Sequence, residues 1–168
     1  MPARAAWDAF KQGIRHPLLK LLFEHWEALE APGGIALKSR FDPIDLPAAL
    51  WPRMHMIRIP EDDSTCRNAV LGGYVVGAVG RDFTGRRLLD SEIPGVTRSV
   101  TYGLLQRLLA DPVPQYHFGP SRFARASRFA AHEQILLPLA DATGRVNAAI
   151  GALDYHGFSF GLFDPAQG

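Results

Sequence analysis

The chain has 168 residues and a formal net charge of +1, because 18 Lys and Arg residues offset 17 Asp and Glu residues. A balance so near zero gives no electrostatic reason to expect binding to nucleic acid or to an anionic membrane. The hydrophobic fraction of 47% is too high for a disordered chain. The single cysteine, Cys66, excludes a disulfide framework. We therefore expect one soluble α+β domain.

No targeting or membrane-spanning segment is predicted. Residues 1–10 lack the apolar core of a signal peptide, because Asp8 interrupts them and Lys11 follows. No stretch approaches the ~20 apolar residues that a membrane-spanning helix needs. Together with the lone cysteine, this pattern predicts a cytoplasmic protein.

Residues 1–31 are expected to form an arm of two short helices. Trp7, Phe10 and Ile14 are spaced to share one helix face, and Pro17 suits the first turn of a second helix. That second helix carries an apolar stripe at Leu18, Leu22, Trp26 and Leu29. Two interpretations stay open: the helices pack on their own domain, or they form a homodimer interface. The interface residues would be Trp7, Phe10, Ile14, Leu18 and Leu22.

The middle of the chain predicts a loop, a hairpin and then helices. Residues 35–53 read as a loop with one helical turn, for which Asp45 is a plausible N-cap. Residues 54–59 and 66–71 are rich in strand formers and read as a hairpin. The glycines of residues 72–85 indicate short helices and tight turns, and residues 96–110 form the best predicted helix.

The last third predicts antiparallel strands at residues 115–118, 129–139 and 145–155, with a hairpin turn at residues 141–144. The fold class is therefore α+β: a five-stranded antiparallel sheet with helices inserted between strands 2 and 3. The expected division is an N-terminal helical arm at 1–31, a core at 32–156 and a tail at 157–168.

This element order and several short motifs resemble a PAS domain, specifically a proteobacterial PAS subfamily long considered a domain of unknown function, whose members often stand alone. The resemblance covers about residues 20–155. The matching positions are Trp26, Arg40, Asp42-Pro43, Leu50 to Pro52, Arg67, Gly72-Gly73, Gly80 to Gly85, Glu133 and Pro138-Leu139. Two positions depart from the pattern: Gly73 replaces a Thr, and an Arg expected soon after the Trp is absent around Glu30.

The resemblance implies a PAS fold that holds small molecules between the sheet and the inserted helices, commonly dimerises through N-terminal helices, and signals to a partner protein. Tyr74, Tyr102 and His117 are candidate lining residues, because each could place a polar tip in an apolar pocket. Arg67 is a candidate ligand or partner contact. The alternatives are a ligand-free interaction scaffold and a haem- or flavin-based redox or gas sensor. No cofactor is firmly implied.

Enzyme signatures fail on their context. Residues 157–161 match G-x-S-x-G, but no His follows them, as a nucleophile elbow requires. The glycines of residues 72–85 contain no phosphate-loop motif. Cys66 lies in a predicted strand rather than in the helical insert, where a flavin-adduct cysteine belongs. We expect no catalysis.

The remaining polar residues predict structural roles. The six histidines lack zinc-site spacing, and the helix at 96–110 has no His to ligate haem. His117 and His132 lie on predicted strands that could face the cavity, which leaves a haem ligand there as an alternative to an ordinary hydrogen-bonded His. Arg81 and Asp82 are expected to hold a local turn. Glu133 is expected to be buried with a charged partner, for which we choose Arg67. The basic run Arg122, Arg125 and Arg128 reads as a solvated rim.

Overall fold

The computed structural model describes residues 4–29, 34–61, 66–88, 100–120 and 131–156. The first half contains helices α1 (Arg4–Gly13) and α2 (Pro17–Ala28), strand β1 (Ala36–Leu37) and 3-10 turns η1 (Lys38–Arg40), η2 (Pro43–Asp45) and η3 (Trp51–Arg53). It continues with the hairpin strands β2 (Met54–Arg58) and β3 (Arg67–Leu71). The second half contains helices α3 (Gly73–Val79) and α4 (Val100–Ala110), and strands β4 (Gln115–Gly119), β5 (Ala131–Ala140) and β6 (Val146–His156).

The predicted five antiparallel strands are confirmed, and their order across the sheet is β4-β5-β6-β2-β3. The helices α3 and α4 come between the second and third of these strands, as expected. The described sheet has a sixth strand that the sequence did not reveal, because β1 pairs in parallel with the end of β5. A strand of two residues is too short to show periodicity.

Strand β5 contacts helices on both faces of the sheet. One of its edges pairs with two different strands, β4 and β1. Residues 132–136 pair with β4 and residues 139–140 pair with β1. Pro138 falls in the gap between these two partners, at the kind of edge position where sheets tolerate proline. Its carbonyl accepts a hydrogen bond from Trp26 Nε1 at 2.7 Å, which ties α2 to β5.

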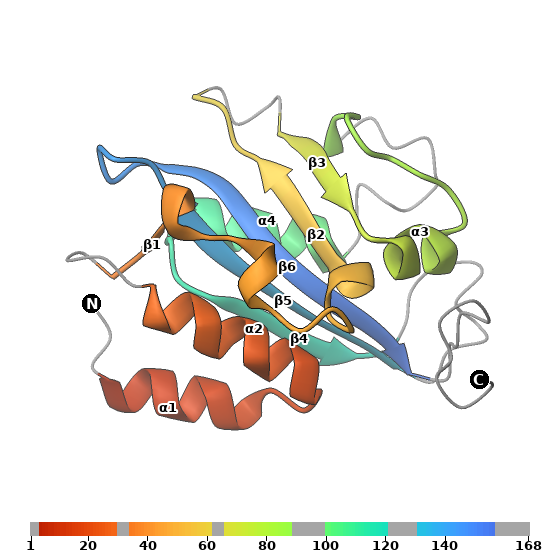
Figure 1. Ribbon diagram of the computed structural model, residues 1–168, viewed down its shortest axis with the longest axis horizontal. Coiled ribbons are helices and arrows are strands. Elements are labelled where there is room, and N and C mark those ends of the chain that lie inside the picture. The colour runs from red at the N-terminus through yellow and green to blue at the C-terminus, as the bar shows by residue number, and fades with distance from the viewer. Residues whose placement is uncertain (1–3, 30–33, 62–65, 89–99, 121–130, 157–168) are drawn as a thin grey trace.

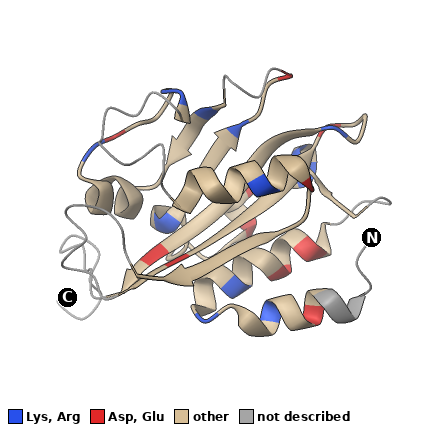
Figure 2. Ribbon diagram, turned by 180° about the vertical axis from the view of Figure 1, so that it is seen from behind, with Lys and Arg blue, Asp and Glu red and all other residues tan. Residues whose placement is uncertain are grey.

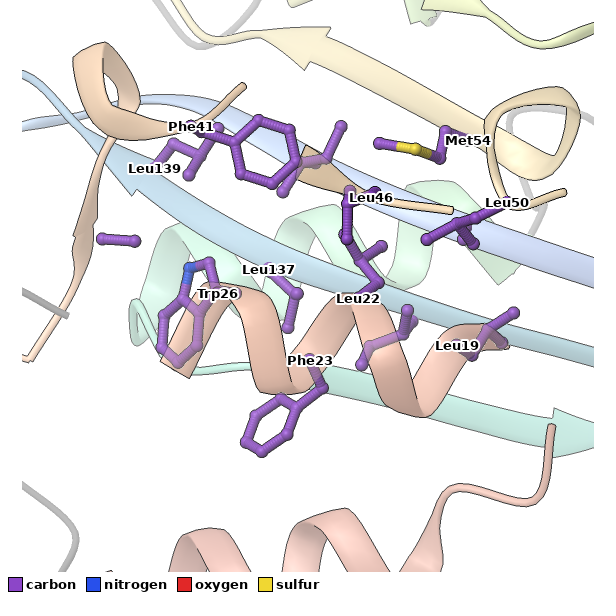
Figure 3. Close-up of a cluster of buried hydrophobic side chains, with 14 of the residues drawn as sticks. Leu19, Leu22, Phe23, Trp26, Phe41, Leu46, Leu50, Met54, Leu137 and Leu139 are labelled. Carbon is purple, nitrogen blue, oxygen red and sulfur yellow. The ribbon is translucent and has the colours of Figure 1, made fainter. Parts of the chain in front are cut away.

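The sheet has an outer face, covered by α1 and α2, and an inner face, covered by α4. The N-terminal helices lie in front of the lower part of the sheet in Figure 1, and α4 crosses its other side in Figure 2. The outer core is apolar and includes Leu19, Leu22, Phe23, Trp26, Phe41, Leu46, Leu50, Met54, Leu137 and Leu139 (Figure 3). The inner core joins Leu104, Leu105 and Leu108 of α4 to Ile57, Leu136 and Ala149 of the sheet.

Three of the five residues predicted for a dimer interface lie inside this chain's own outer core. Trp7, Ile14 and Leu22 are buried there, and the Trp7 ring packs 5.9 Å from the Trp26 ring. These three side chains therefore offer no surface to a second subunit in this arrangement, and the interface expectation is corrected for them. Phe10 and Leu18 pack against the same core but remain partly exposed.

Local details follow from backbone chemistry. Pro17 opens α2 as predicted. The turn η2 is capped by Asp42, whose Oδ1 accepts the Ile44 N–H at 3.0 Å, and not by Asp45, which ends the turn. Gly80 ends α3 in the left-handed region at φ 83, where glycine carries no steric penalty. No helix in the described ranges is long and apolar enough to span a bilayer.

Candidate functional site

The inner face of the sheet carries polar side chains next to the apolar layer under α4. Alternation along β5 turns His132 and Gln134 toward this face, while Glu133 between them faces α1 and α2. His55 of β2 and His117 of β4 occupy inner positions of neighbouring strands. A sheet face that is otherwise apolar and buried therefore gathers several groups that form hydrogen bonds.

Gln134 is the centre of one hydrogen-bonded group. Its Nε2 lies 3.0 Å from His55 Nε2 and donates to Thr101 Oγ1 of α4 at 2.9 Å. Thr101 Oγ1 in turn lies 3.1 Å from Gln134 Oε1, to which it can donate. His55 packs so tightly over Gly151 that a Cβ added there would lie 2.6 Å from its ring. This group connects β2, β5 and α4.

His132 is the centre of a second group. Its ring lies 4.8 Å from the Tyr155 ring and 5.8 Å from the His117 ring. Only 3% of His132 is exposed. Its Nε2 has no hydrogen-bond partner among the residues that the structure describes. A buried ring nitrogen of this kind is costly unless something hydrogen-bonds to it.

Burial keeps His55 and His132 neutral at ordinary pH. It lowers the pKa of His55 from 6.5 to about 4. Burial also lowers the pKa of His132 to about 3, and the neighbouring rings of His117 and His55 add to the effect. A neutral imidazole carries one donor and one acceptor nitrogen, so both residues can complement a polar molecule without contributing charge.

The inner-facing positions of the described strands carry no Asp, Glu, Lys or Arg. Full ionic charge is expensive to bury without a charged partner. The chemistry of this face therefore suits an uncharged molecule that has both apolar surface and hydrogen-bonding groups.

The charged residues gather on the outer face instead. Glu133 and Asp154 are direct partners across β5 and β6. Asp154 pairs with Arg53, and Glu133 accepts hydrogen bonds from the turn between α1 and α2. Glu133 is buried as predicted, but the predicted Arg67 partner is wrong: Arg67 is exposed and donates to the Gly85 carbonyl at 3.0 Å.

Tyr74 packs against Leu153 and Tyr155, whose ring lies beside His132, whereas Arg67 lies apart from the inner polar groups. The Tyr74 hydroxyl lies 3.0 Å from Asp154 Oδ1 and accepts the Tyr155 N–H at 2.9 Å. Burial raises its pKa to about 12, and the Arg53 guanidinium lies 4.1 Å from the centre of its ring. The Tyr74 hydroxyl is therefore engaged by the chain itself, at the end of the sheet. Arg67 lies on the edge strand β3.

The other two predicted lining residues also lie on the inner side. His117 faces inward beside His132, and Tyr102 of α4 packs partly buried against the inner core. His55, Thr101 and Gln134 were not expected at the site from the sequence, whereas His132 was expected on a strand that could face the cavity. The strand alternation that separates Glu133 from His132 and Gln134 was a usable signal for Gln134. Thr101 gave no such signal, because only the packing of α4 places it beside Gln134.

Metal and redox sites find no support among the described residues, in which no group of three His, Cys, Asp or Glu could hold a metal ion. Cys66 is buried in the inner core next to the start of β3, outside the helices themselves. The Asp82 carboxylate caps its own turn by accepting the Thr84 N–H at 2.9 Å. The G-x-S-x-G stretch at 157–161 and the basic run Arg122, Arg125 and Arg128 lie outside the described residues.

Comparison with solved structures identifies the fold. No family model and no curated protein matches this chain. Among solved structures, the light-state dimer of the fungal blue-light photoreceptor Vivid is 10% identical, with a TM-score of 0.50, over 83% of this chain and 95% of that one. The PAS domain of BvgS from Bordetella pertussis is 15% identical, with a TM-score of 0.48, over 69% of this chain and 81% of that one.

The fold is the PAS fold, as the sequence resemblance predicted. At such low identity these structures show the arrangement of strands and helices and nothing more specific. The chemistry of any site therefore has to come from this chain's own residues.

Proposed function

We propose that this PAS-fold chain is a sensory module of the cytoplasm that binds a small uncharged molecule on the inner face of its sheet and passes the binding state to a partner protein. No catalytic step belongs to the proposal. The molecule would contact the inner groups around Gln134 and His132, beneath α4.

One observation supports this proposal most directly. His132 is buried, its pKa is lowered to about 3, and its Nε2 lacks a partner among the described residues. A side-chain core built only for packing gains nothing from such a group, whereas a ligand donor or acceptor would satisfy it. His55, Gln134 and Thr101 supply further hydrogen-bonding groups on the same face.

The position of the N-terminal helices supports the signalling half of the proposal. The helices α1 and α2 cover the opposite face of the same strands. Leu21 of α2 is 39% exposed, and Phe10 and Leu18 are partly exposed. A partner protein or a second copy of this chain would contact this outer surface. The Vivid structure with the same fold is a dimer.

Native mass spectrometry of the purified protein tests the proposal, with a denatured mass measured alongside. We expect extra mass that disappears on denaturation, and a released molecule that is neutral at pH 7. The variant Gln134→Leu removes the central amide and should abolish the extra mass. The matched variant Gln106→Leu alters an exposed position of α4 and should retain it.

The alternatives give different results in the same experiment. A ligand-free scaffold shows only multiples of the chain mass in every variant. A haem or flavin sensor shows visible colour and the corresponding cofactor mass. Loss of the extra mass in Gln106→Leu as well as in Gln134→Leu would contradict binding at the inner face.

A further inference from the structure

Residues 132–134 of β5 connect the two faces of the sheet within three positions. His132 and Gln134 face the inner polar groups, and Glu133 faces the turn between α1 and α2. Consecutive strand residues rise only about 3.3 Å along one backbone. A displacement of this backbone at Gln134 therefore displaces Glu133 as well.

Glu133 holds the turn between the helices by several hydrogen bonds. Its Oε1 accepts the N–H of Arg15 at 2.9 Å, the N–H of His16 at 2.8 Å and the Tyr116 hydroxyl at 2.9 Å. Its Oε2 lies 3.3 Å from His156 Nε2. The side chain is 0% exposed, so its carboxylate depends on these partners in place of water.

The place of these contacts matters for the arm. His16 is the N-cap of α2, and Pro17, the first residue of that helix, has no N–H to offer. A carboxylate at this end also meets the positive end of the dipole of the 12-residue helix α2. Glu133 is therefore fixed to the N-terminal end of α2 through backbone N–H groups. Side-chain rearrangement in the arm cannot substitute for these donors.

The hydrogen bonds to Glu133 keep its carboxylate ionised. Burial alone would raise its pKa, but the hydrogen bonds from the His16 N–H, Tyr116, His156 and the Arg15 N–H outweigh burial and hold the pKa below its ordinary value. Asp154, the cross-strand neighbour, has its own cation in Arg53.

We propose that Glu133 is a positioning residue that couples the inner face to the helical arm, so that a change in the hydrogen bonds of Gln134 alters how firmly the α1–α2 turn is held. The proposal rests on the proposed function for its natural trigger, a bound molecule. The coupling itself requires no ligand, because Thr101 and His55 already contact Gln134 from the inner side.

Amide hydrogen exchange of residues 15–29 tests the coupling in a double-mutant cycle on the full chain. Thr101→Val removes the hydroxyl that bonds Gln134 and leaves β5 unaltered. We expect it to accelerate exchange of the arm about five-fold, the lower end of typical coupling between sites. Glu133→Gln should accelerate arm exchange by itself, and adding Thr101→Val should then produce no further change.

Two controls separate coupling from general destabilisation. Thr143→Val removes a hydroxyl that bonds Asp141 in the distant hairpin, and it should leave arm exchange unchanged. Tyr116→Phe removes one donor to Glu133 and serves as a milder variant if Glu133→Gln fails to fold.

The proposal is overturned if Thr101→Val leaves arm exchange unchanged, or if it accelerates exchange equally with and without Glu133. These outcomes are independent of ligand retention. Coupling in a protein that carries no ligand would leave the positioning role standing and remove the proposed function. A retained ligand without coupling would do the reverse.

Discussion

At the residue scale, the two buried inner histidines should make stability depend on pH. Their pKa values in the folded state, about 4 for His55 and about 3 for His132, lie below the ordinary value of 6.5. Between pH 6.5 and these values, the unfolded chain therefore binds protons at both histidines, whereas the folded chain does not. The resulting stability is complete above pH 6.5 and is lost as the pH falls toward the folded values.

Urea unfolding between pH 7 and pH 4 measures this effect. Each histidine should contribute up to about 1.4 kcal/mol per pH unit to the slope within its window. His55→Gln and His132→Gln should each flatten the dependence. Leu105→Val, which removes apolar contact without titrating, should lower stability while the slope stays the same. An unchanged slope in both histidine variants would show that neither residue is held neutral by burial.

A pair of adjacent glycines gives a second prediction at the same scale. A Cβ on Gly72 would lie 2.3 Å from the Pro52 carbonyl oxygen, whereas a Cβ on Gly73 meets nothing within 4 Å. Gly72→Ala should therefore lower the free energy of unfolding by about 1–3 kcal/mol through overpacking. Gly73→Ala should be neutral or stabilise by about 0.4–1 kcal/mol. Thermal or urea unfolding of the two variants makes the comparison, and equal losses would refute the steric argument.

At the scale of elements, the helical arm is part of the hydrophobic core and is not an added surface layer. Trp7, Ile14 and Leu22 are buried against the outer face, and Trp26 Nε1 donates a hydrogen bond to the Pro138 carbonyl. Deletion of residues 1–30 would uncover that apolar face, and large exposed apolar surfaces favour association. We expect an aggregate or an unfolded chain by size-exclusion chromatography and circular dichroism. A truncated chain that is soluble, folded and still dimeric would contradict both the packing role and dimerisation through the arm.

At the scale of the whole molecule, local sequence patterns predicted most elements. Proline and glycine marked the helix ends and the hairpin, as the left-handed Gly144 at φ 86 illustrates. Alternation and helical spacing identified the five antiparallel strands and the helices that enclose them. Strand β1 escaped, because two residues carry no period.

The candidate site was less predictable, because it depends on contacts between distant segments. Thr101 and Gln134 are 33 positions apart, and His55 and Gln134 are 79 apart. Tyr74 was selected for its polar tip, but its hydroxyl bonds Asp154, which no local pattern could indicate. Glu133 was recognised as buried, yet its actual donors are backbone groups of the arm, which carry no sequence signature.

Nuclear magnetic resonance of the imidazole nitrogens tests the central claim most directly. The protein, labelled with ¹⁵N-histidine, is measured as purified and again after unfolding, removal of small molecules and refolding. The account predicts that the His55 and His132 signals shift between the two samples, while the His25 signal of α2, on the outer face, stays in place. Identical histidine spectra from the two samples would contradict a ligand on the inner face.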